Sequence, residues 1–284
     1  MIAPDSNFWR HVDGVLVINL DARPERYARL FSEWADMQMA APPLTRLSAV
    51  SGVDLPGFGE RPWFRKGASD RRWGARAGCT LSHRKAMAHA RENNWTTTLV
   101  LEDDADLTHI TPRFIEILGT ALFGKDAPQW DVCYLGFSKS VGPSLKLCQL
   151  NDNHGLFEVT GCYTTHAYLV RAAARDWIFE QIALAEKTWA WHARHRIIDR
   201  WYTRHLYRSQ RVLAVSPSLI PQTEGFSDIV QRQVDYASDF TSNVTCVAPD
   251  LSNFRRHRCW FRFLQNLSNG VDLIRALGKR WRGF

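Results

Sequence analysis

The sequence predicts an α/β fold with a largely parallel sheet. Short apolar runs rich in β-branched residues, typical of strands that are covered on both faces, alternate along the chain with segments of helix-forming residues. The length of 284 residues, with 45% hydrophobic and 23% charged residues, is typical of a folded globular protein of one large domain or two small ones. This composition excludes a disordered chain, collagen and a coiled coil.

The elements follow from local patterns taken in chain order. The run GVLVINL at residues 14–20 predicts a buried strand, and Pro24 suits the first turn of the helix after it. Residues 51–77 are rich in Gly, Pro, Arg and Trp and predict a long loop, whereas Ser82 is a plausible cap for the next helix. The predicted strands cover residues 14–20, 96–101, 131–137 and 163–170, and the predicted helices cover residues 24–39, 82–93, 111–123, 171–186 and 197–208.

The net charge of +7 is confined to the end of the chain. Residues 251–284 contain eight Lys or Arg residues and one acid, Asp272, which leaves 28 charges of each sign in residues 1–250. We therefore expect a neutral domain at 1–250 and a basic tail at 251–284. The neutral body argues against a nucleic-acid-binding protein, although the tail alone would fit one.

The tail is predicted to form an amphipathic helix. Its apolar residues recur at three-and-four spacing among Arg and Lys, with Gly270 as a candidate break. Residues 255–282 are therefore expected to bind an anionic membrane surface; the alternative is a helix docked on the domain with solvated arginines. The apolar residues are Trp260, Phe263, Leu264, Leu267, Val271, Ile274, Leu277 and Trp281.

The cysteine pattern and the hydropathy of the chain predict where in the cell the protein lies. The six cysteines form no CxxC pair, no leader of charged then apolar residues precedes the first predicted strand, and no apolar run approaches the roughly 20 residues that cross a bilayer. We expect reduced thiols in a cytoplasmic protein, soluble or peripheral on the cytoplasmic face of the inner membrane.

Four carboxylates follow the second predicted strand, in the sequence EDDAD at residues 102–106. Carboxylates this close repel one another unless a cation compensates, and a hard divalent cation such as Mn²⁺ or Mg²⁺ is their natural partner. Such a site can hold the metal against a diphosphate. The alternative is an acidic turn that precedes a helix.

Several blocks together resemble one family. They are VINLDARPER at 17–26, AVSG at 49–52, AGCTLSH at 77–83 and LVLEDD at 99–104, with weaker blocks at 161–168, 221–222 and 227–229. In this order, the blocks resemble the family 25 glycosyltransferases, which include bacterial lipooligosaccharide galactosyltransferases and are related to the collagen hydroxylysine galactosyltransferases. One departure is that the family's Gly-Glu-x-Gly-Cys reads ARAGC at 75–79, so an acidic residue expected near the donor is missing.

The resemblance implies a glycosyltransferase A fold, in which a Rossmann-like sheet flanked by helices binds a nucleotide sugar. It implies inverting transfer of a hexose, commonly galactose from UDP-galactose, to a hydroxyl of an oligosaccharide or glycolipid in lipooligosaccharide or lipopolysaccharide synthesis. Asp104 is our first choice as metal ligand, with Glu102, and His166 could complete the metal shell, although a lone histidine is usually structural. The donor-binding candidates are Asn19, Leu20, Arg23, Ala49, Gly52, Gly78, Ser82, His83, Glu102, Asp103, Gln222 and Ser227.

Inverting transfer also needs a base that takes the proton of the acceptor hydroxyl. Asp199, in IIDRW, and Glu224, in QTEGF, are the candidates, and Asp199 is slightly preferred. Each could equally be an ordinary surface carboxylate.

Two other functions stay open on the sequence alone. The acidic cluster would also suit a metal-dependent hydrolase of phosphoester or glycosidic bonds. The departure at residues 75–77 would suit a catalytically degenerate protein that binds the donor without transferring it.

Overall fold

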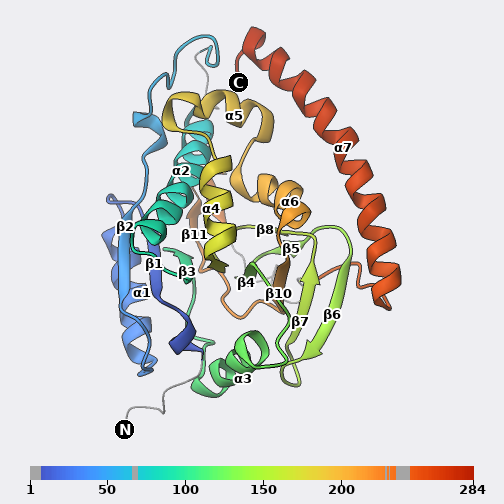
Figure 1. Cartoon of the computed structure of the whole chain (residues 1–284). Helices are drawn as coiled ribbons and strands as arrows, with labels where there is room; N and C mark the ends of the chain where they lie inside the picture. Colours follow the sequence, from blue (N-terminus) through green and yellow to red (C-terminus); the bar gives the residue numbers. More distant parts are fainter. Residues whose placement is uncertain (1–7, 66–69, 228, 230, 235–243) are drawn as a thin grey trace.

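The computed structural model describes residues 8–65, 70–227, 229, 231–234 and 244–284. An eight-stranded mixed sheet forms the centre of the molecule and helices flank it (Figure 1), which confirms the α/β class. The strands are β1 Gly14–Asn19, β2 Leu44–Ser48, β3 Thr97–Glu102, β4 Val132–Gly136, β5 Lys139–Ser140, β6 Ser144–Gln149, β7 Gly155–Val159, β8 Cys162–Tyr163, β9 Ala167–Arg171, β10 Val212–Ser216, β11 Gly225–Ser227 and β12 Arg232–Val234. The helices are α1 Pro24–Asp36, α2 Asp70–Glu92, α3 Pro112–Phe123, α4 Ala172–Gln181, α5 Thr188–His195, α6 Ile198–Ser209 and α7 Leu251–Arg282, with short 3₁₀ helices at Trp9–His11, Gly52–Asp54 and Ala185–Lys187.

The sheet is mixed, so the expectation of a largely parallel sheet is wrong. Its strand order is β2-β1-β3-β9-β4-β10-β7-β6. The pairs β1–β2, β1–β3 and β4–β10 are parallel, whereas β9 is antiparallel to both β3 and β4, and β7 is antiparallel to β10 and β6. No crossover helix lies between β4 and β9, and a parallel neighbour requires such a crossover.

The second helix starts earlier than the sequence pattern predicts. Helix α2 begins at Asp70, so its first two turns replace the end of the loop expected at 51–77, of which residues 66–69 lie outside the described part of the chain. Ser82 is consequently in the middle of a helix and is not its cap; its hydroxyl donates to the carbonyl of Gly78 at 2.7 Å. The glycines and tryptophan of this segment led to the prediction of a loop, whereas in the structure these residues allow close packing of the helix.

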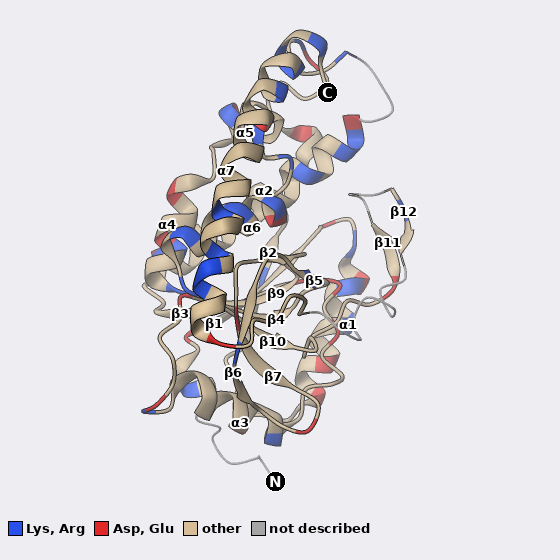
Figure 2. Cartoon of the chain, turned by 90° about the vertical axis from the view of Figure 1, so that its right-hand side faces the viewer, with Lys and Arg blue, Asp and Glu red and all other residues tan. Residues whose placement is uncertain are grey.

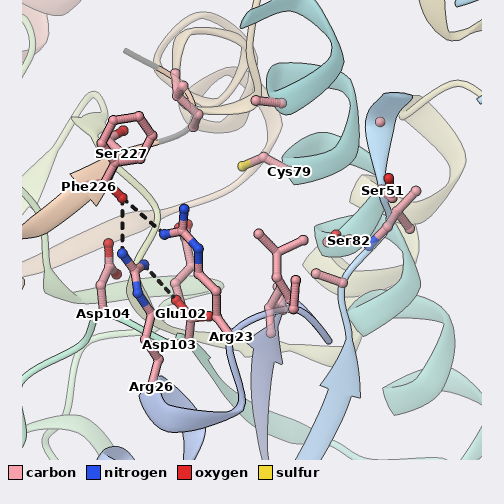
Figure 3. Close-up of a pocket in the computed structure, with 18 of the residues that line it drawn as sticks. Arg23, Arg26, Ser51, Cys79, Ser82, Glu102, Asp103, Asp104, Phe226 and Ser227 are labelled. Atoms are coloured by element: carbon pink, nitrogen blue, oxygen red, sulfur yellow. Dashed lines mark hydrogen bonds and ion pairs between the residues drawn. The ribbon is translucent and has the colours of Figure 1, made fainter. Parts of the chain in front are cut away.

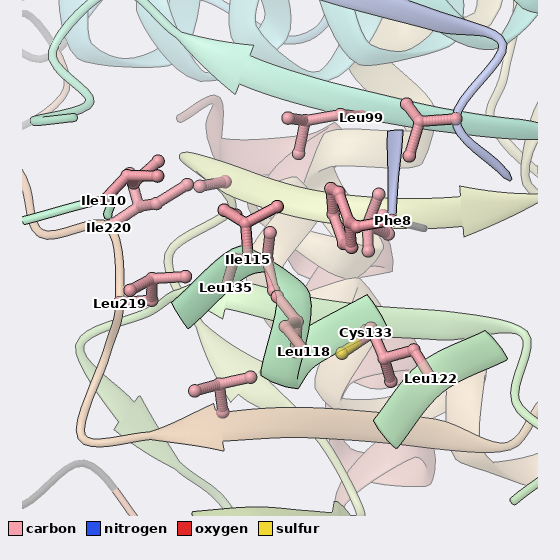
Figure 4. Packing of buried hydrophobic residues seen from close by; sticks show 14 of the residues in the cluster. Phe8, Leu99, Ile110, Ile115, Leu118, Leu122, Cys133, Leu135, Leu219 and Ile220 are labelled. Carbon is pink, nitrogen blue, oxygen red and sulfur yellow. The ribbon is translucent and has the colours of Figure 1, made fainter. Parts of the chain in front are cut away.

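The core lies on both faces of the sheet. Alternate residues of β1 enter opposite clusters: Val15 and Val17 pack with α1 and α3, and Leu16 and Ile18 pack with α2, α4 and α6. Figure 4 shows the first cluster, where the side chains of α3 lie against those of β3 and β4. Burial on both faces explains the unbroken apolar run that predicted this strand.

The tail forms one helix, α7, which Gly270 does not interrupt, contrary to expectation. The chain end folds back onto an aromatic cluster beside α2 and α5, where the ring of Phe284 stacks on Trp73 with centroids 4.1 Å apart. The division at residue 250 stays a prediction. Among the described residues, no helix has the length and apolar character needed to span a membrane.

Candidate functional site

A pocket of about 770 Å³ lies at the carboxyl ends of β1 and β3, the edge where parallel α/β sheets commonly bind ligands. Helix α2 and the β11 segment contribute its other walls, and Figure 3 shows the acidic and basic side chains that meet in it. Most of the predicted site residues line this pocket: Leu20, Arg23, Ala49, Gly52, Ser82, His83, Glu102, Asp103, Asp104 and Ser227.

Glu102 and Asp103 each have two side-chain partners in the protein. Glu102 accepts hydrogen bonds from the Thr165 hydroxyl at 2.9 Å and from His83 Nε2 at 3.1 Å. Burial acts to raise the pKa of Glu102, but the contacts with His83 outweigh it and lower that pKa. Asp103 accepts from Asn19 Nδ2 at 2.8 Å and pairs with Arg26 at 3.3 Å, although burial still raises its pKa. The Asp103 carboxylate therefore links β1 and α1 to the end of β3.

Asp104 has an unsatisfied oxygen. Its Oδ2 accepts from Gln222 Nε2 at 2.9 Å, whereas Oδ1 is buried and has no hydrogen-bond partner. Burial, followed by the negative charges of Glu102 and Asp103, raises the pKa of Asp104 to about 7. A buried anionic oxygen next to two other carboxylates is unfavourable without a cation. The observed donors therefore fit a hard divalent ion at Asp104.

The raised pKa of Asp104 predicts that the stability of the folded protein depends on pH. Folded protein keeps the Asp104 proton up to about pH 7, whereas the unfolded chain loses it near the ordinary pKa of 3.8. The folded state therefore binds more protons in this window, and the free energy of unfolding falls as pH rises through it. We expect Asp104→Asn to unfold with a free energy about 1–3 kcal/mol above that of the wild type at pH 8, without added metal. Urea unfolding at pH 5 and pH 8 checks this; a difference that is the same at both pH values would refute it.

A second donor set overlaps the first. Cys79 Sγ, a ring nitrogen of His83 and a carboxylate oxygen of Glu102 all lie within 4.8 Å of one another. Sulfur and nitrogen ligands favour zinc or another softer metal over Mn²⁺. Burial raises the pKa of the Cys79 thiol well above its ordinary value, so metal binding there would have to displace a proton. The sequence pattern missed Cys79, but its position four residues before His83 on one helix was an available signal.

Guanidinium groups stand at the rim of the pocket. Arg23 and Arg26 each donate to the carbonyl of Phe226, at 3.1 and 3.0 Å, and so join the start of α1 to β11. Arg26 and Arg71 also line the pocket, although neither was among the predicted donor-binding residues. Arginine is well suited to phosphate oxygens because it presents several N–H donors in one plane.

The loop at residues 49–52 approaches α2 at backbone contact distance. A Cβ atom added at Gly52 would overlap the carbonyl oxygen of Gly74, and one added at Gly78 would overlap that of Val50. The Ser82 hydroxyl accepts from Val50 N at 2.8 Å and fixes the loop in place. These predicted donor-binding residues therefore shape the pocket wall, and Gly78 acts from behind it.

We expect Gly52→Ala to lower the free energy of unfolding by about 2 kcal/mol or more, because loop and helix must separate to admit a methyl group. Gly270→Ala is the control: nothing lies within 4 Å of a Cβ there, and alanine should stabilise the helix interior by about 0.5–1 kcal/mol. Urea unfolding of both variants makes the comparison. Equal stability of Gly52→Ala and wild type would contradict the close approach.

The predicted metal ligand His166 is not brought to the pocket. It is fully buried, and its ring nitrogens contact the Ile220 carbonyl at 2.8 Å and the Thr164 hydroxyl at 3.2 Å. Burial lowers the pKa of His166 to about 4. These contacts argue for a structural role just before the start of β9. Asn19 and Gln222 likewise act through the carboxylates that they contact.

The two predicted bases lie in different surroundings. Asp199, at the start of α6, accepts from the backbone N–H groups of Arg200 and Thr164. Burial raises its pKa against these hydrogen bonds, and the negative charge of Glu102 raises it further. Glu224 is exposed and lies between two residues that line the pocket, Thr223 and Gly225. Neither carboxylate lines the pocket itself.

No protein-family model matches this chain, and no curated protein matches it. Among solved structures, the crystal structure of A197 from STIV aligns with a TM-score of 0.35 and 12% sequence identity, over 84% of this chain and 97% of that chain. A likeness at this level does not decide family or activity. The function is therefore inferred from the chemistry of the site.

Proposed function

We propose that this chain is an inverting, metal-dependent glycosyltransferase with a glycosyltransferase A fold. It would transfer a hexose from a UDP-sugar to a hydroxyl of a saccharide acceptor, and galactose is the first candidate for that hexose. The observation that carries the proposal is the buried, unpartnered Oδ1 of Asp104 among three carboxylates, in a large pocket at the ends of parallel strands. The sequence blocks that resemble the family 25 glycosyltransferases meet at this pocket and support the same conclusion.

Asp104 and Glu102 are the residues that would hold a divalent cation. Mn²⁺ or Mg²⁺ held there would supply positive charge to stabilise a diphosphate leaving group. Asp103, between them in the chain, is held by its contacts with Asn19 and Arg26. The Cys79 thiol next to Glu102 leaves a softer metal as the second choice.

The chain's own cations and backbone complete the donor site. Arg23 and Arg26 line the pocket at the end of β1, where the diphosphate of a nucleotide would pass, and guanidinium groups suit phosphate oxygens. The loop at 49–52, held against α2, lines the pocket and would form a wall for the nucleoside. This arrangement favours a nucleotide sugar over a simple phosphoester.

Asp199 is the base that we propose for the acceptor hydroxyl. Its raised pKa makes it a stronger base than a solvated aspartate, and two backbone N–H groups hold its carboxylate in place. Glu224 is the alternative base. A lipooligosaccharide or lipopolysaccharide acceptor follows from the family resemblance alone.

A test of transfer is the acceptor dependence of UDP release. Purified protein is given UDP-galactose and Mn²⁺, with and without a β-galactoside or glucoside acceptor, and the product anomer is assigned by NMR. UDP release that requires the acceptor, with inverted configuration in the product, is expected. Equal release without acceptor would favour the hydrolase, and donor binding without release would favour the degenerate donor-binding protein.

A further inference from the structure

Helix α7 is docked through Phe254, Gln265 and Asp272, whereas most of its large apolar side chains face outward. Gln265 and Asp272 are only 9% and 3% exposed, whereas Ile274 is 71% and Trp281 is 83% exposed. A surface helix of a globular protein normally shows the reverse, with an apolar stripe towards the core. The exposed apolar face of α7 therefore indicates a surface that binds a partner.

Specific polar contacts fix this orientation. Asp272 pairs with Arg204 of α6, and Gln265 donates to the Thr203 carbonyl at 3.1 Å and accepts from the Tyr207 hydroxyl at 2.8 Å. Rotating α7 to bury its apolar side would carry Asp272 away and leave the buried Arg204 guanidinium without its carboxylate partner, which is costly. The apolar face stays outward because the polar face is bound.

The exposed apolar residues form one stripe along the helix. At 3.6 residues per turn they fall mainly on the side opposite Phe254, Gln265 and Asp272, and the stripe spans much of a helix about 48 Å long. Tryptophans stand near both ends of it. The residues of the stripe are Trp260, Phe263, Leu264, Leu267, Val271, Leu273, Ile274, Leu277 and Trp281, and Leu251, at the first turn of α7, is exposed as well.

The charge around the stripe is of one sign. Figure 2 shows Lys and Arg recurring along α7, and the helix has a single acid, the buried Asp272. The exposed cations flank the apolar stripe on both sides. They are Arg255, Arg256, Arg262, Arg275, Arg280 and Arg282.

We propose that the outer face of α7 binds an anionic lipid bilayer, with the helix lying in the plane of the headgroups. Arginines that flank an apolar stripe complement anionic headgroups, and tryptophan favours the membrane interface. A second copy of this chain fits less well, because two such faces would bring arginines together with no acidic residue between them. This proposal rests on α7 alone and not on the proposed reaction.

Vesicle co-sedimentation of the full chain tests it, using phosphatidylcholine vesicles with and without 30 mol% phosphatidylglycerol. We expect binding that needs phosphatidylglycerol and weakens at high salt. Leu267→Glu, at a 58% exposed site in the stripe, should bind about tenfold less. Leu184→Glu is the matched control, because Leu184 is 53% exposed but lies outside α7, and it should bind as the wild type does.

Arg262→Gln with Arg280→Gln should remove most of the preference for anionic vesicles, and all variants should unfold at the wild-type temperature because the changed residues are exposed. Three outcomes would overturn the proposal: no binding to either vesicle, equal loss in Leu267→Glu and Leu184→Glu, or a dimer in sedimentation velocity that Leu267→Glu dissociates while vesicles bind nothing.

Discussion

We expect Asp104→Asn to lower the rate of UDP release from UDP-galactose by a factor of about 10³ or more. The variant keeps the shape of the side chain and its contact with Gln222 but removes the anionic oxygen that has no protein partner. Charge neutralisation by a metal on the leaving group is worth several kcal/mol, which corresponds to this factor. The measurement is the initial rate of UDP release at saturating Mn²⁺ and acceptor.

Asp106→Asn is the matched control for this prediction. Asp106 lies two residues further along the chain, accepts from the backbone and hydroxyl of Thr108, and does not line the pocket. Its change should leave the rate within about twofold of the wild type, as for a surface substitution. Equal effects of the two variants would mean that the acidic cluster acts only through its overall charge.

We expect Asp199→Asn to lower turnover by about 10²–10⁴ while changing UDP affinity little. The amide cannot accept the acceptor proton, yet it fits the same space at the start of α6. Because Asp199 does not line the donor pocket, the loss should appear in the turnover number and not in nucleotide binding. Steady-state rates and UDP calorimetry on the same sample separate the two.

Glu224→Gln provides the comparison, since Glu224 is the alternative base on an exposed site near the pocket. If Glu224→Gln loses turnover and Asp199→Asn keeps it, the roles are reversed. If both variants keep turnover, neither carboxylate is the base.

The strands that hold the site could be predicted because their burial is continuous. Residues of β1 face a core on each side, and this leaves a nearly continuous apolar run in the sequence. The acidic residues were found because they follow β3 directly and so reach the pocket edge. Position along the chain was sufficient to place Asp104 at the pocket, because it lies just after the end of the strand.

Several features could not be predicted because they depend on contacts distant in sequence. The hairpin β6–β7 lies between β4 and β9 in the chain, where the sequence analysis missed both strands. The alternation in SLKLCQ and the turn residues Asn151–His154 were the available signal. The contact between Asn19 and Asp103 joins residues that are 84 positions apart. The docked face of α7 was hidden for the same reason, since Arg204 decides it from another helix.

Calorimetric titration with UDP, with and without Mn²⁺, tests the central claim most directly. The wild type is compared with Asp104→Ala, and GDP is the control nucleotide. The account predicts UDP binding that requires the metal, is selective over GDP and is lost in Asp104→Ala. Failure of UDP to bind the wild type in either condition, or metal-dependent binding that survives Asp104→Ala, would contradict it.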